Sequence, residues 1–336
     1  MQQKGKSPTM KDVAREAGVS LGTVSNVFNG LPVGGEYRQK VEEAAVRLGY
    51  AVNSYARGLR AEKTNTVAVI LPNLVNAFYA EMANAICREL TRLHYRTVLA
   101  ITEYDPLAES RCIQMLRRNM VEGIIGLTYS TDQIDVEGMP YVSIDRIISP
   151  AIPCVTSDNY GGGAMAAEKL ISLGCRNLLC LRTGSAILGE TDKRGGGFAA
   201  ACSFQKVDFT LKRFNDEDGM EGLYQFLDEH TDGGKLEFDG IFCSTDLLLY
   251  QVRRHLCRQG VRVPEDVQMI GYDGIRVFFS EEYTCSTIVQ PVTKIAESAV
   301  SILMNWSQST PSALVSLPVQ YMPGGTTKEQ VTELGQ

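Results

Sequence analysis

Several features that mark particular classes of protein are scarce or missing in this sequence. It has only three histidines, and its nine cysteines include no CxxC pair. A structural metal site needs ligands clustered at short spacing, so no metal is expected, and scattered cysteines in odd number fit reduced thiols in the core of a cytoplasmic protein. The motifs GxxxxGK[ST] and GxGxxG are also missing, and the single GxSxG run, Gly18 to Gly22, lies between two helical stretches rather than at the end of a strand, where a nucleophile elbow would need it. Without a phosphate loop or a nucleophile elbow, neither a cofactor nor an enzymatic activity is expected.

Long hydrophobic runs are missing as well. The longest ones, such as VAVILP at 67–72, have the length of a strand, whereas a membrane span needs about 20 residues. The first ten residues contain two lysines with no apolar stretch behind them, so no secretory signal is expected. With 336 residues, 44% of them hydrophobic, the chain is long enough for two or three globular domains and needs no membrane partner.

The net charge of −6 is unevenly distributed along the chain. Residues 1–63 carry ten Lys and Arg against six acidic residues, which gives +4, and the remainder carries −10. A basic segment on an acidic chain is typical of a protein in which only that segment meets a polyanion.

The first fifty residues have the pattern of three short helices. Thr9 is a candidate N-cap for the first helix, and Gly18 is placed to end it. Ser20 is the candidate N-cap of a second helix over 21–29, and a third amphipathic helix is expected at about 36–48. A helix, a short glycine turn and a second helix form the helix-turn-helix motif.

The outward face of the second predicted helix carries short, uncharged side chains. Its residues are Leu21, Gly22, Ser25, Asn26 and Asn29. Such a face can approach base edges in a major groove, and the hydroxyls of Ser20, Thr23 and Ser25 can donate to phosphates. A three-helix module that makes only protein contacts is the alternative interpretation.

A longer pattern over this segment resembles the head of the LacI/GalR family of bacterial transcription regulators. It consists of the run TMKDVAREAGVS at 9–20, then Thr23-Val24-Ser25, Asn29-Gly30, Leu48-Gly49-Tyr50 and Ala56-Arg57-Gly58-Leu59-Arg60. The resemblance implies that Leu21, Gly22 and Asn26 read bases of double-stranded DNA.

By the same resemblance, residues 51–63 form a hinge and linker whose helix folds on the operator. Asn53 and Ala56 are then DNA contacts, and Leu59 resembles the leucine that is wedged into the minor groove. An apolar wedge of this kind unstacks a base step and bends the duplex. A core leucine in an ordinary linker helix is the alternative for Leu59.

The head departs from the family pattern at three places. Asn26 stands where the family very often has arginine, so a bidentate guanine contact is missing and adenine is the favoured base. Gly22 removes a side chain from a base-reading position. Serine and threonine, usual at the start of the third helix, are replaced by Gly34, Gly35 and Tyr37. The operator is therefore expected to differ from the commonest sequence of the family.

From Thr66 onward, apolar strands alternate with amphipathic helices. Strands are expected at 66–72, 97–101, 123–128, 141–145, 177–181, 241–245 and 267–273, and helices at 77–92, 105–119, 160–173, 246–258 and 291–307. Apolar strands joined by crossover helices form parallel sheets that are buried on both faces. The pattern predicts two Rossmann-like lobes that divide near 150–155.

Polar or aromatic residues follow these strands, at the ends where open parallel sheets bind ligands. Together with the runs Asp145-Arg146, Arg194 to Phe198 and Gly271-Tyr272-Asp273, they resemble the periplasmic-binding-protein-like body of the same family. The resemblance implies an effector site formed by Phe78, Tyr79, Asp145, Arg194, Thr245, Asp273 and Gln290. Two alternatives stay open here: Asp246 is as good a helix N-cap as a ligand, and Phe78 and Tyr79 could belong partly to the core.

The predicted fold class is therefore α/β, with three segments. A helix-turn-helix head occupies 1–50, the hinge helix and linker 51–63, and the two-lobed, periplasmic-binding-protein-like body 64–336. Lobe 1 is expected at about 64–152 plus 291–319, and lobe 2 at about 153–290 plus 320–326.

The function that these expectations imply is repression of transcription under the control of a small-molecule effector. An arginine and carboxylates that can each engage two hydroxyls favour a sugar, with a purine or another metabolite as the alternative. A homodimer on a near-palindromic operator is expected. A sugar-binding receptor of a transport system would share the two lobes, but it would lack the head.

Overall fold

The computed structural model describes residues 8–28, 30–50, 64–118, 121–127, 136, 138–184, 189–215, 219–277, 280–307 and 313–329. The chain forms two compact units, Met1–Thr64 and Asn65–Gln336. None of the helices in these described ranges is both long enough and apolar enough to span a membrane.

The first unit is a bundle of three helices, α1 (Met10–Ala17), α2 (Leu21–Phe28) and α3 (Gly35–Leu48). Thr9 caps α1 in a capping box, because its hydroxyl accepts from the amide of Asp12 and the Asp12 carboxylate accepts from the amide of Thr9. Gly18 ends α1 in the left-handed conformation, with φ 64°. The core is formed by Val13, Ala14, Val24, Val27, Val41, Ala44 and Ala45. The predicted helix-turn-helix head is confirmed.

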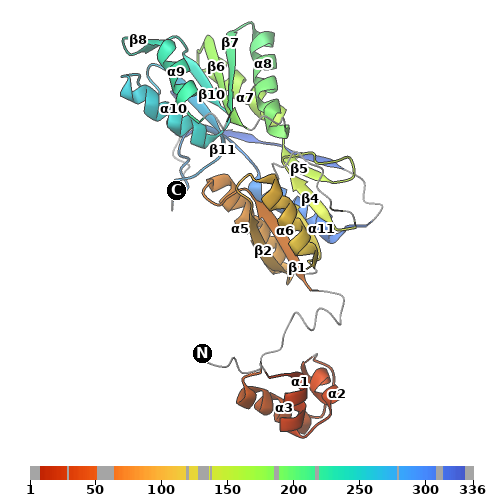
Figure 1. The fold of residues 1–336 in the computed structure, drawn as a ribbon. Coiled ribbons are helices and arrows are strands. Elements are labelled where there is room, and N and C mark those ends of the chain that lie inside the picture. The colour runs from red at the N-terminus through yellow and green to blue at the C-terminus, as the bar shows by residue number, and fades with distance from the viewer. Residues whose placement is uncertain are drawn as a thin grey trace. The chain divides into compact units, whose positions relative to one another are not determined.

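The second unit contains two six-stranded sheets (Figure 1). Sheet 1 has the order β13-β5-β4-β3-β1-β2 and is parallel throughout. Its strands are β1 (Thr66–Leu71), β2 (Arg96–Ile101), β3 (Gly123–Gly126), β4 (Tyr141–Ile144), β5 (Cys154–Ser157) and β13 (Leu314–Leu317).

Sheet 2 has the order β14-β12-β11-β10-β6-β7, and only β14 runs antiparallel to its neighbour. Its strands are β6 (Asn177–Gly184), β7 (Asp208–Asn215), β10 (Gly240–Cys243), β11 (Gln268–Asp273), β12 (Thr287–Val289) and β14 (Gln320–Met322). A short hairpin, β8 (Thr231–Asp232) with β9 (Lys235–Leu236), adds a third, two-stranded sheet.

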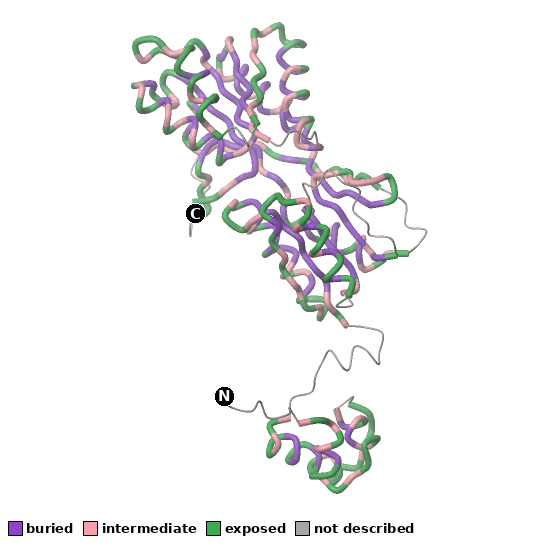
Figure 2. The backbone as a smooth tube through the Cα atoms, viewed as in Figure 1, coloured by how far each residue is buried: buried purple, intermediate pink, exposed green. Residues whose placement is uncertain are grey.

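Helices cover both faces of each large sheet, and Figure 2 shows the strands buried between them. On sheet 1, α5 (Ala77–Arg92) and α11 (Val292–Met304) pack on one face and α6 (Pro106–Arg118) on the other. On sheet 2, α7 (Asn159–Ser172) and α8 (Lys193–Gln205) pack on one face, and α9 (Glu221–Glu229) and α10 (Asp246–Arg258) on the other. A short 3₁₀ helix, η1 (Glu190–Asp192), precedes α8. The α/β fold class is confirmed.

The sequence pattern missed several elements of the second unit. The strand β7 is an edge strand with the sequence DFTLKRFN, which is polar and largely exposed, and α8 contains three consecutive glycines. Neither segment gives the periodicity expected for its structure. The strand β5 belongs to sheet 1, so the division between the lobes expected at 152/153 is wrong and lies beyond Ser157.

A direct backbone contact joins α7 and α8. A Cβ atom on Gly163 would lie 1.8 Å from the carbonyl oxygen of Arg194, and one on Gly197 would lie 1.9 Å from the carbonyl oxygen of Tyr160. Both distances are far below van der Waals contact, so only glycine permits this approach. Because Arg194 lies on the contact itself, the packing of the two helices also places the start of α8.

We expect Gly163→Ala to destabilise the second unit by about 1–3 kcal/mol or more, because a backbone atom cannot move aside as a flexible side chain can. Thermal melting of the purified protein measures the effect. Gly196→Ala is the matched control: its Cβ would meet only the ring of Tyr160 at 3.8 Å, and alanine favours helix by about 1 kcal/mol. Equal melting temperatures for the two variants would contradict the close approach.

Candidate functional site

The outward face of α2 carries the predicted base-reading residues of the head. Leu21, Gly22 and Asn26 are exposed, and Ser25 is half-buried. The Ser20 hydroxyl caps the helix, since it accepts from the amide of Thr23 at 3.1 Å. The start of α2 therefore presents a capped helix N-terminus beside short side chains, a combination that suits contact with a phosphate and with base edges.

Four of the predicted DNA contacts lie outside the described residues. They are Asn29 in the head and Asn53, Ala56 and Leu59 in the hinge segment. Their assignment as DNA contacts stays a prediction.

In the second unit, Arg194 is the centre of a buried polar network. Its side chain lies in the first turn of α8 and is 4% exposed. Nε donates to Oδ1 of Asn159 at 2.7 Å, and Nη1 donates to the carbonyl oxygen of Ser244 at 2.6 Å. The guanidinium also lies 3.6 Å from the centre of the Tyr272 ring, in cation–π contact.

Asp273 and Gln290 extend this network from the ends of β11 and β12. Oδ1 of Asp273 is 3.8 Å from Nη1 of Arg194 and accepts from Nε2 of Gln290 at 2.8 Å. Oε1 of Gln290 accepts from the Ser157 hydroxyl at 2.6 Å, at the end of β5 in sheet 1. Gln290 therefore joins the carboxyl ends of strands from the two sheets.

Asp145 joins the network from the end of β4. Its Oδ1 accepts from the Thr156 hydroxyl at 2.7 Å, and Thr156 in turn accepts from Nδ2 of Asn159 at 2.9 Å. Asn159 thus connects Asp145 and Thr156 to Arg194. The structure brings together four of the seven predicted effector residues: Asp145, Arg194, Asp273 and Gln290.

Burial controls the protonation of the two carboxyl groups. Loss of solvent raises the pKa of Asp145 and of Asp273, and the positive charge of Arg194 opposes that rise at both. Ligand hydroxyls that bind here would meet carboxyl groups held away from water.

Both acids also have left-handed backbone conformations, with φ 59° at Asp145 and 122° at Asp273. Residues other than glycine rarely adopt such angles, and the strain persists only where surrounding contacts fix it. Strained positions are common at ligand sites, so the backbone also supports a functional role for these two acids.

Thr245, rather than Asp246, is the N-cap of α10. Its hydroxyl accepts from the amide of Leu248 at 3.1 Å, so the expectation that Asp246 could cap the helix is wrong. The buried carboxylate of Asp246 instead accepts from the amides of Gly274 and Ile275 at 2.9 and 2.7 Å and from the Thr287 hydroxyl at 2.6 Å. Asp246 thereby fixes the backbone that follows Asp273.

Phe78 and Tyr79 lie in the core of lobe 1. They are 5% and 6% exposed, and their rings pack edge-on with 5.9 Å between their centres. For these two residues and for Thr245, a role in effector binding stays a prediction.

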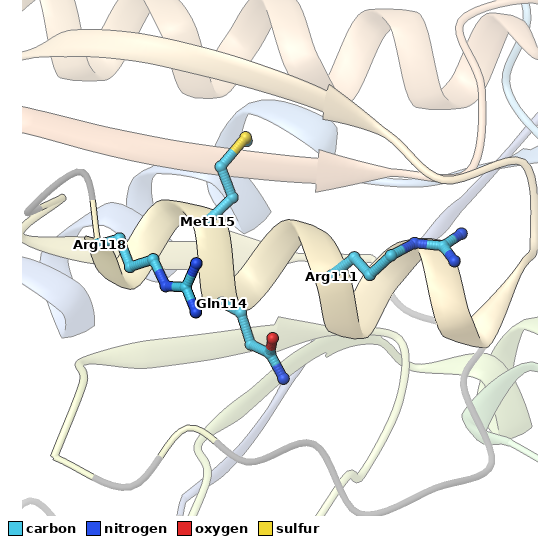
Figure 3. Close-up of a pocket in the computed structure, with 4 residues that line it drawn as sticks. All are labelled: Arg111, Gln114, Met115 and Arg118. Carbon is cyan, nitrogen blue, oxygen red and sulfur yellow. The ribbon is translucent and has the colours of Figure 1, made fainter.

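Two surface hollows lie elsewhere and contain none of the predicted effector residues. One, of about 330 Å³, is lined by Arg111, Gln114, Met115 and Arg118, all from α6 (Figure 3). The other, of about 360 Å³, is lined by Glu42, Glu43, Val46 and Arg47 of α3. Side chains from a single helix do not enclose a ligand, so neither hollow competes with the polar network as an effector site.

Three further members of the network, Thr156, Ser157 and Asn159, were not predicted from the sequence. They lie at the end of β5 and the start of α7. Polar residues at the carboxyl end of a strand would mark them, as at the other strands, but β5 is only four residues long and has no periodicity that predicts a strand.

Comparison with known proteins assigns a family to both units. Residues 9–53 match the model of bacterial regulatory proteins of the LacI family. Residues 64–309 match the model of periplasmic binding proteins and the sugar binding domain of the LacI family.

Curated relatives match the chain over almost its whole length. The sucrose operon repressor of Pediococcus pentosaceus is 31% identical, over 95% of this chain and 99% of its own. The ribose operon repressor of Bacillus subtilis (strain 168) is also 31% identical, over 96% of this chain and 99% of its own.

A solved structure of the Lac repressor dimer bound to operator and the anti-inducer ONPF has the same fold. The TM-score is 0.78 at 23% identity, over 96% of this chain and 99% of that chain. The family models and the full-length relatives together identify the chain as a member of the LacI family of bacterial regulatory proteins and a transcriptional repressor of that family.

Proposed function

We propose that the chain is a homodimeric repressor whose affinity for a near-palindromic operator is controlled by a sugar bound at the polar network. The observation that carries the proposal is the convergence of Asp145, Arg194, Asp273 and Gln290 at the carboxyl ends of strands from both sheets. Ligands of open parallel sheets bind at these ends.

The chemistry of the network favours a ligand rich in hydroxyl groups. Carboxylates accept from hydroxyls, a guanidinium donates to two neighbouring oxygens, and the Gln290 amide can do both. The names of the two curated relatives, a sucrose and a ribose operon repressor, support a sugar. A purine would need an apolar or aromatic face, and the rings of Phe78 and Tyr79 are packed in the core.

Control of DNA binding would arise because one network holds both lobes. A sugar that binds Gln290 competes with Ser157 of lobe 1 and with Asp273 of lobe 2. Binding would then favour one arrangement of the lobes, and the hinge residues Asn53, Ala56 and Leu59 would respond. Such coupling amounts typically to 1–3 kcal/mol and acts equally in both directions.

Selection of bound sequences from random duplex DNA tests the function. The purified protein is used at stated ionic strength, with and without a pool of sugars, because salt alone changes such affinities strongly. A recovered palindrome whose enrichment changes with the pool supports the proposal. A palindrome whose enrichment no sugar changes would support a repressor but contradict a sugar effector. Recovery of single half-sites would contradict the homodimer.

We expect Arg194→Ala to abolish the response to the sugar found in this screen while operator binding persists. The substitution removes donors to the ligand and leaves Asn159 and the Ser244 carbonyl without their partner, which costs about 1–3 kcal/mol for each buried group. Calorimetric titration with the sugar and a gel-shift titration with the operator measure the two effects.

Arg258→Ala, at an exposed arginine that ends α10, is the matched control and should leave both titrations unchanged. Thermal melting shows whether the Arg194 variant is folded. If the Arg194 variant binds the sugar as tightly as the parent protein does, Arg194 does not belong to the sugar site.

We expect Asn26→Ala to weaken binding to the preferred operator by about 1–3 kcal/mol and to relax selectivity at one base position. The exposed amide of Asn26 can contact an adenine edge through two hydrogen bonds, and alanine can make neither. Repeating the DNA selection with the variant measures the change. Gln39→Ala, at an exposed amide on α3, is the control, and an unchanged site preference for the Asn26 variant would show that α2 reads the bases through other residues.

We expect Asp273→Asn to stabilise the sugar-free protein increasingly as the pH rises. Burial raises the pKa of Asp273 in the folded protein above its value in the unfolded chain. The free energy of unfolding therefore falls as the pH rises from about 4, the pKa of an unperturbed aspartate, and stops falling once the pH exceeds the pKa in the folded protein. Asparagine keeps the oxygen that accepts from Gln290 and carries no charge.

Melting temperatures of parent and variant should agree near pH 4. Near pH 8 the variant should melt at a higher temperature than the parent, by about 2–4 °C for each kcal/mol that the substitution adds to the free energy of unfolding. A difference that stays constant over this range would mean that Asp273 titrates in the folded protein as it does in the unfolded chain.

A further inference from the structure

The edge strand β7 has an outer side that no described strand covers. It is the last strand in the order of sheet 2, and among the strands that the structure describes it pairs only with β6. The backbone amides and carbonyls along such an edge are a template for a further strand. Three consecutive residues of β7, Leu211, Lys212 and Arg213, are exposed, so the helices on the two faces of the sheet leave this edge accessible.

The two faces of β7 carry different chemistry, because side chains alternate along a strand. Phe209 packs against the core cluster beneath α7 and α8, so Leu211 belongs to that face as well. The ammonium group of Lys212 lies 5.1 Å from the centre of the Phe226 ring in α9, which places Lys212 and Asp208 on the opposite face. One face of the edge thus offers apolar side chains, and the other offers an acid and a base.

Two apolar side chains at this edge are exposed to solvent. Phe204, in the last turn of α8 and four residues before β7, is 89% exposed, and Leu211 is 47% exposed. Since α8 covers the face of the sheet to which Leu211 belongs, both side chains lie on the same side of sheet 2. Apolar side chains gathered beside an unpaired edge indicate a contact with another protein chain.

The sequence of β7 is complementary to itself in one antiparallel register. A two-fold axis places residue i of one copy opposite residue j of the second copy, and residue j opposite residue i. With the axis at Thr210, Asp208 lies opposite Lys212 of the second copy, and Phe209 lies opposite Leu211. Each of these pairs occurs twice. Pairs of opposite charge and pairs of apolar side chains both stabilise a sheet when they lie directly opposite each other.

The adjacent registers lack this complementarity. An axis one residue later would place Asp208 opposite Phe214, so that a charge would meet an aromatic ring. An axis one residue earlier would place Lys212 opposite Lys206, and like charges in that position destabilise a sheet. Lysine on an edge strand normally prevents pairing. Here it excludes a wrong register and permits the one in which it meets Asp208.

We propose that β7 pairs antiparallel with β7 of a second copy, about an axis at Thr210, and that this pairing joins two operator-binding dimers into a tetramer. The inference goes beyond the proposed function, because it needs neither the effector nor the polar network. The chain enters the second unit from the head at β1 of sheet 1, whereas β7 belongs to sheet 2. A contact through β7 therefore leaves sheet 1 to the association of two heads on one operator, and the tetramer presents two pairs of heads to two operators.

Reversal of the paired charges in the full chain tests the register. The variants are Asp208→Lys, Lys212→Asp and the protein that carries both substitutions. Four residues along one strand separate the two positions by about 13 Å, so they do not pair within one copy. Only pairing between copies makes the doubly substituted protein equivalent to the parent. Lys235→Asp, at an exposed lysine of β9, is the matched control.

Sedimentation equilibrium measures the mass at concentrations of about 1–100 µM and at stated ionic strength, because the association depends on both. We expect four chains for the parent and for Lys235→Asp. The dissociation constant of the tetramer into dimers should rise by about tenfold or more in each single variant, which places like charges opposite each other. It should return to within about threefold of the parent value when both substitutions are combined.

Phe204→Ser tests the apolar side of the contact independently of the charges. Because the ring is 89% exposed, its loss should leave the melting temperature unchanged, whereas the dissociation constant of the tetramer should rise. The melting temperatures of the charge variants show that they are folded.

Two results overturn the pairing: a parent that contains two chains at every concentration, or a doubly substituted protein that dissociates as readily as the single variants. A tetramer that every variant retains would place the contact on another face. Gel-shift titration with the operator recovered by selection separates this inference from the proposed function, because each single variant should bind one operator as tightly as the parent does. Weaker binding of the single variants to one operator would assign β7 to the dimer and overturn the tetramer.

Discussion

The buried guanidinium of Arg194 is the constraint around which the second unit is arranged. A cation that is only 4% exposed is tolerated only when its charge and its donors are satisfied, because unpaired burial of charge costs several kcal/mol. The structure meets this demand with groups from separate strands and helices: the Asn159 amide, the Ser244 carbonyl, the Tyr272 ring and the Asp273 carboxyl group. Each of these groups lies at the carboxyl end of a strand in sheet 2 or at the start of a helix beside it.

The close contact between α7 and α8 follows from the same constraint. Asn159 starts one helix and Arg194 lies in the first turn of the other, so their hydrogen bond requires the two helix starts to be near each other. Gly163 and Gly197 permit that approach, because any larger residue would collide with the backbone of the opposite helix. Glycine lowers helix propensity by about 1 kcal/mol relative to alanine. The lower helix propensity is tolerated here because the close approach of α7 and α8 positions the guanidinium of Arg194.

The pattern of strands and helices predicted the fold class, and the resemblance to the LacI family implied four members of the network, whose convergence fits the rule that residues after parallel strands meet whatever their separation in the chain. Neither could predict the role of Asn159, since the preceding strand is only the four residues CVTS and has no periodicity to detect. The choice between Thr245 and Asp246 as helix cap depended on backbone angles that either residue type accepts. Phe78 and Tyr79 follow a strand as ligands do, but packing against the rest of α5 and against α11 buries them. Packing of this kind is a tertiary property that one residue's position does not reveal.

The network also explains how a small ligand could change the arrangement of the lobes. The chain crosses between the sheets after β5, after β12 and after β13, and Ser157 and Gln290 lie at the first two crossings. The amide of Gln290 is engaged on both sides, by Ser157 through its oxygen and by Asp273 through its nitrogen. A ligand cannot bind this amide without releasing one of those partners, so ligand binding and the geometry of the crossings form one equilibrium. One hydrogen bond between neutral groups contributes about 0.5–1.5 kcal/mol, and one to a charged group about 1.5–3 kcal/mol. Exchange of one or two such bonds is therefore enough for the coupling of 1–3 kcal/mol that is typical of allosteric proteins, and no large new interface is required.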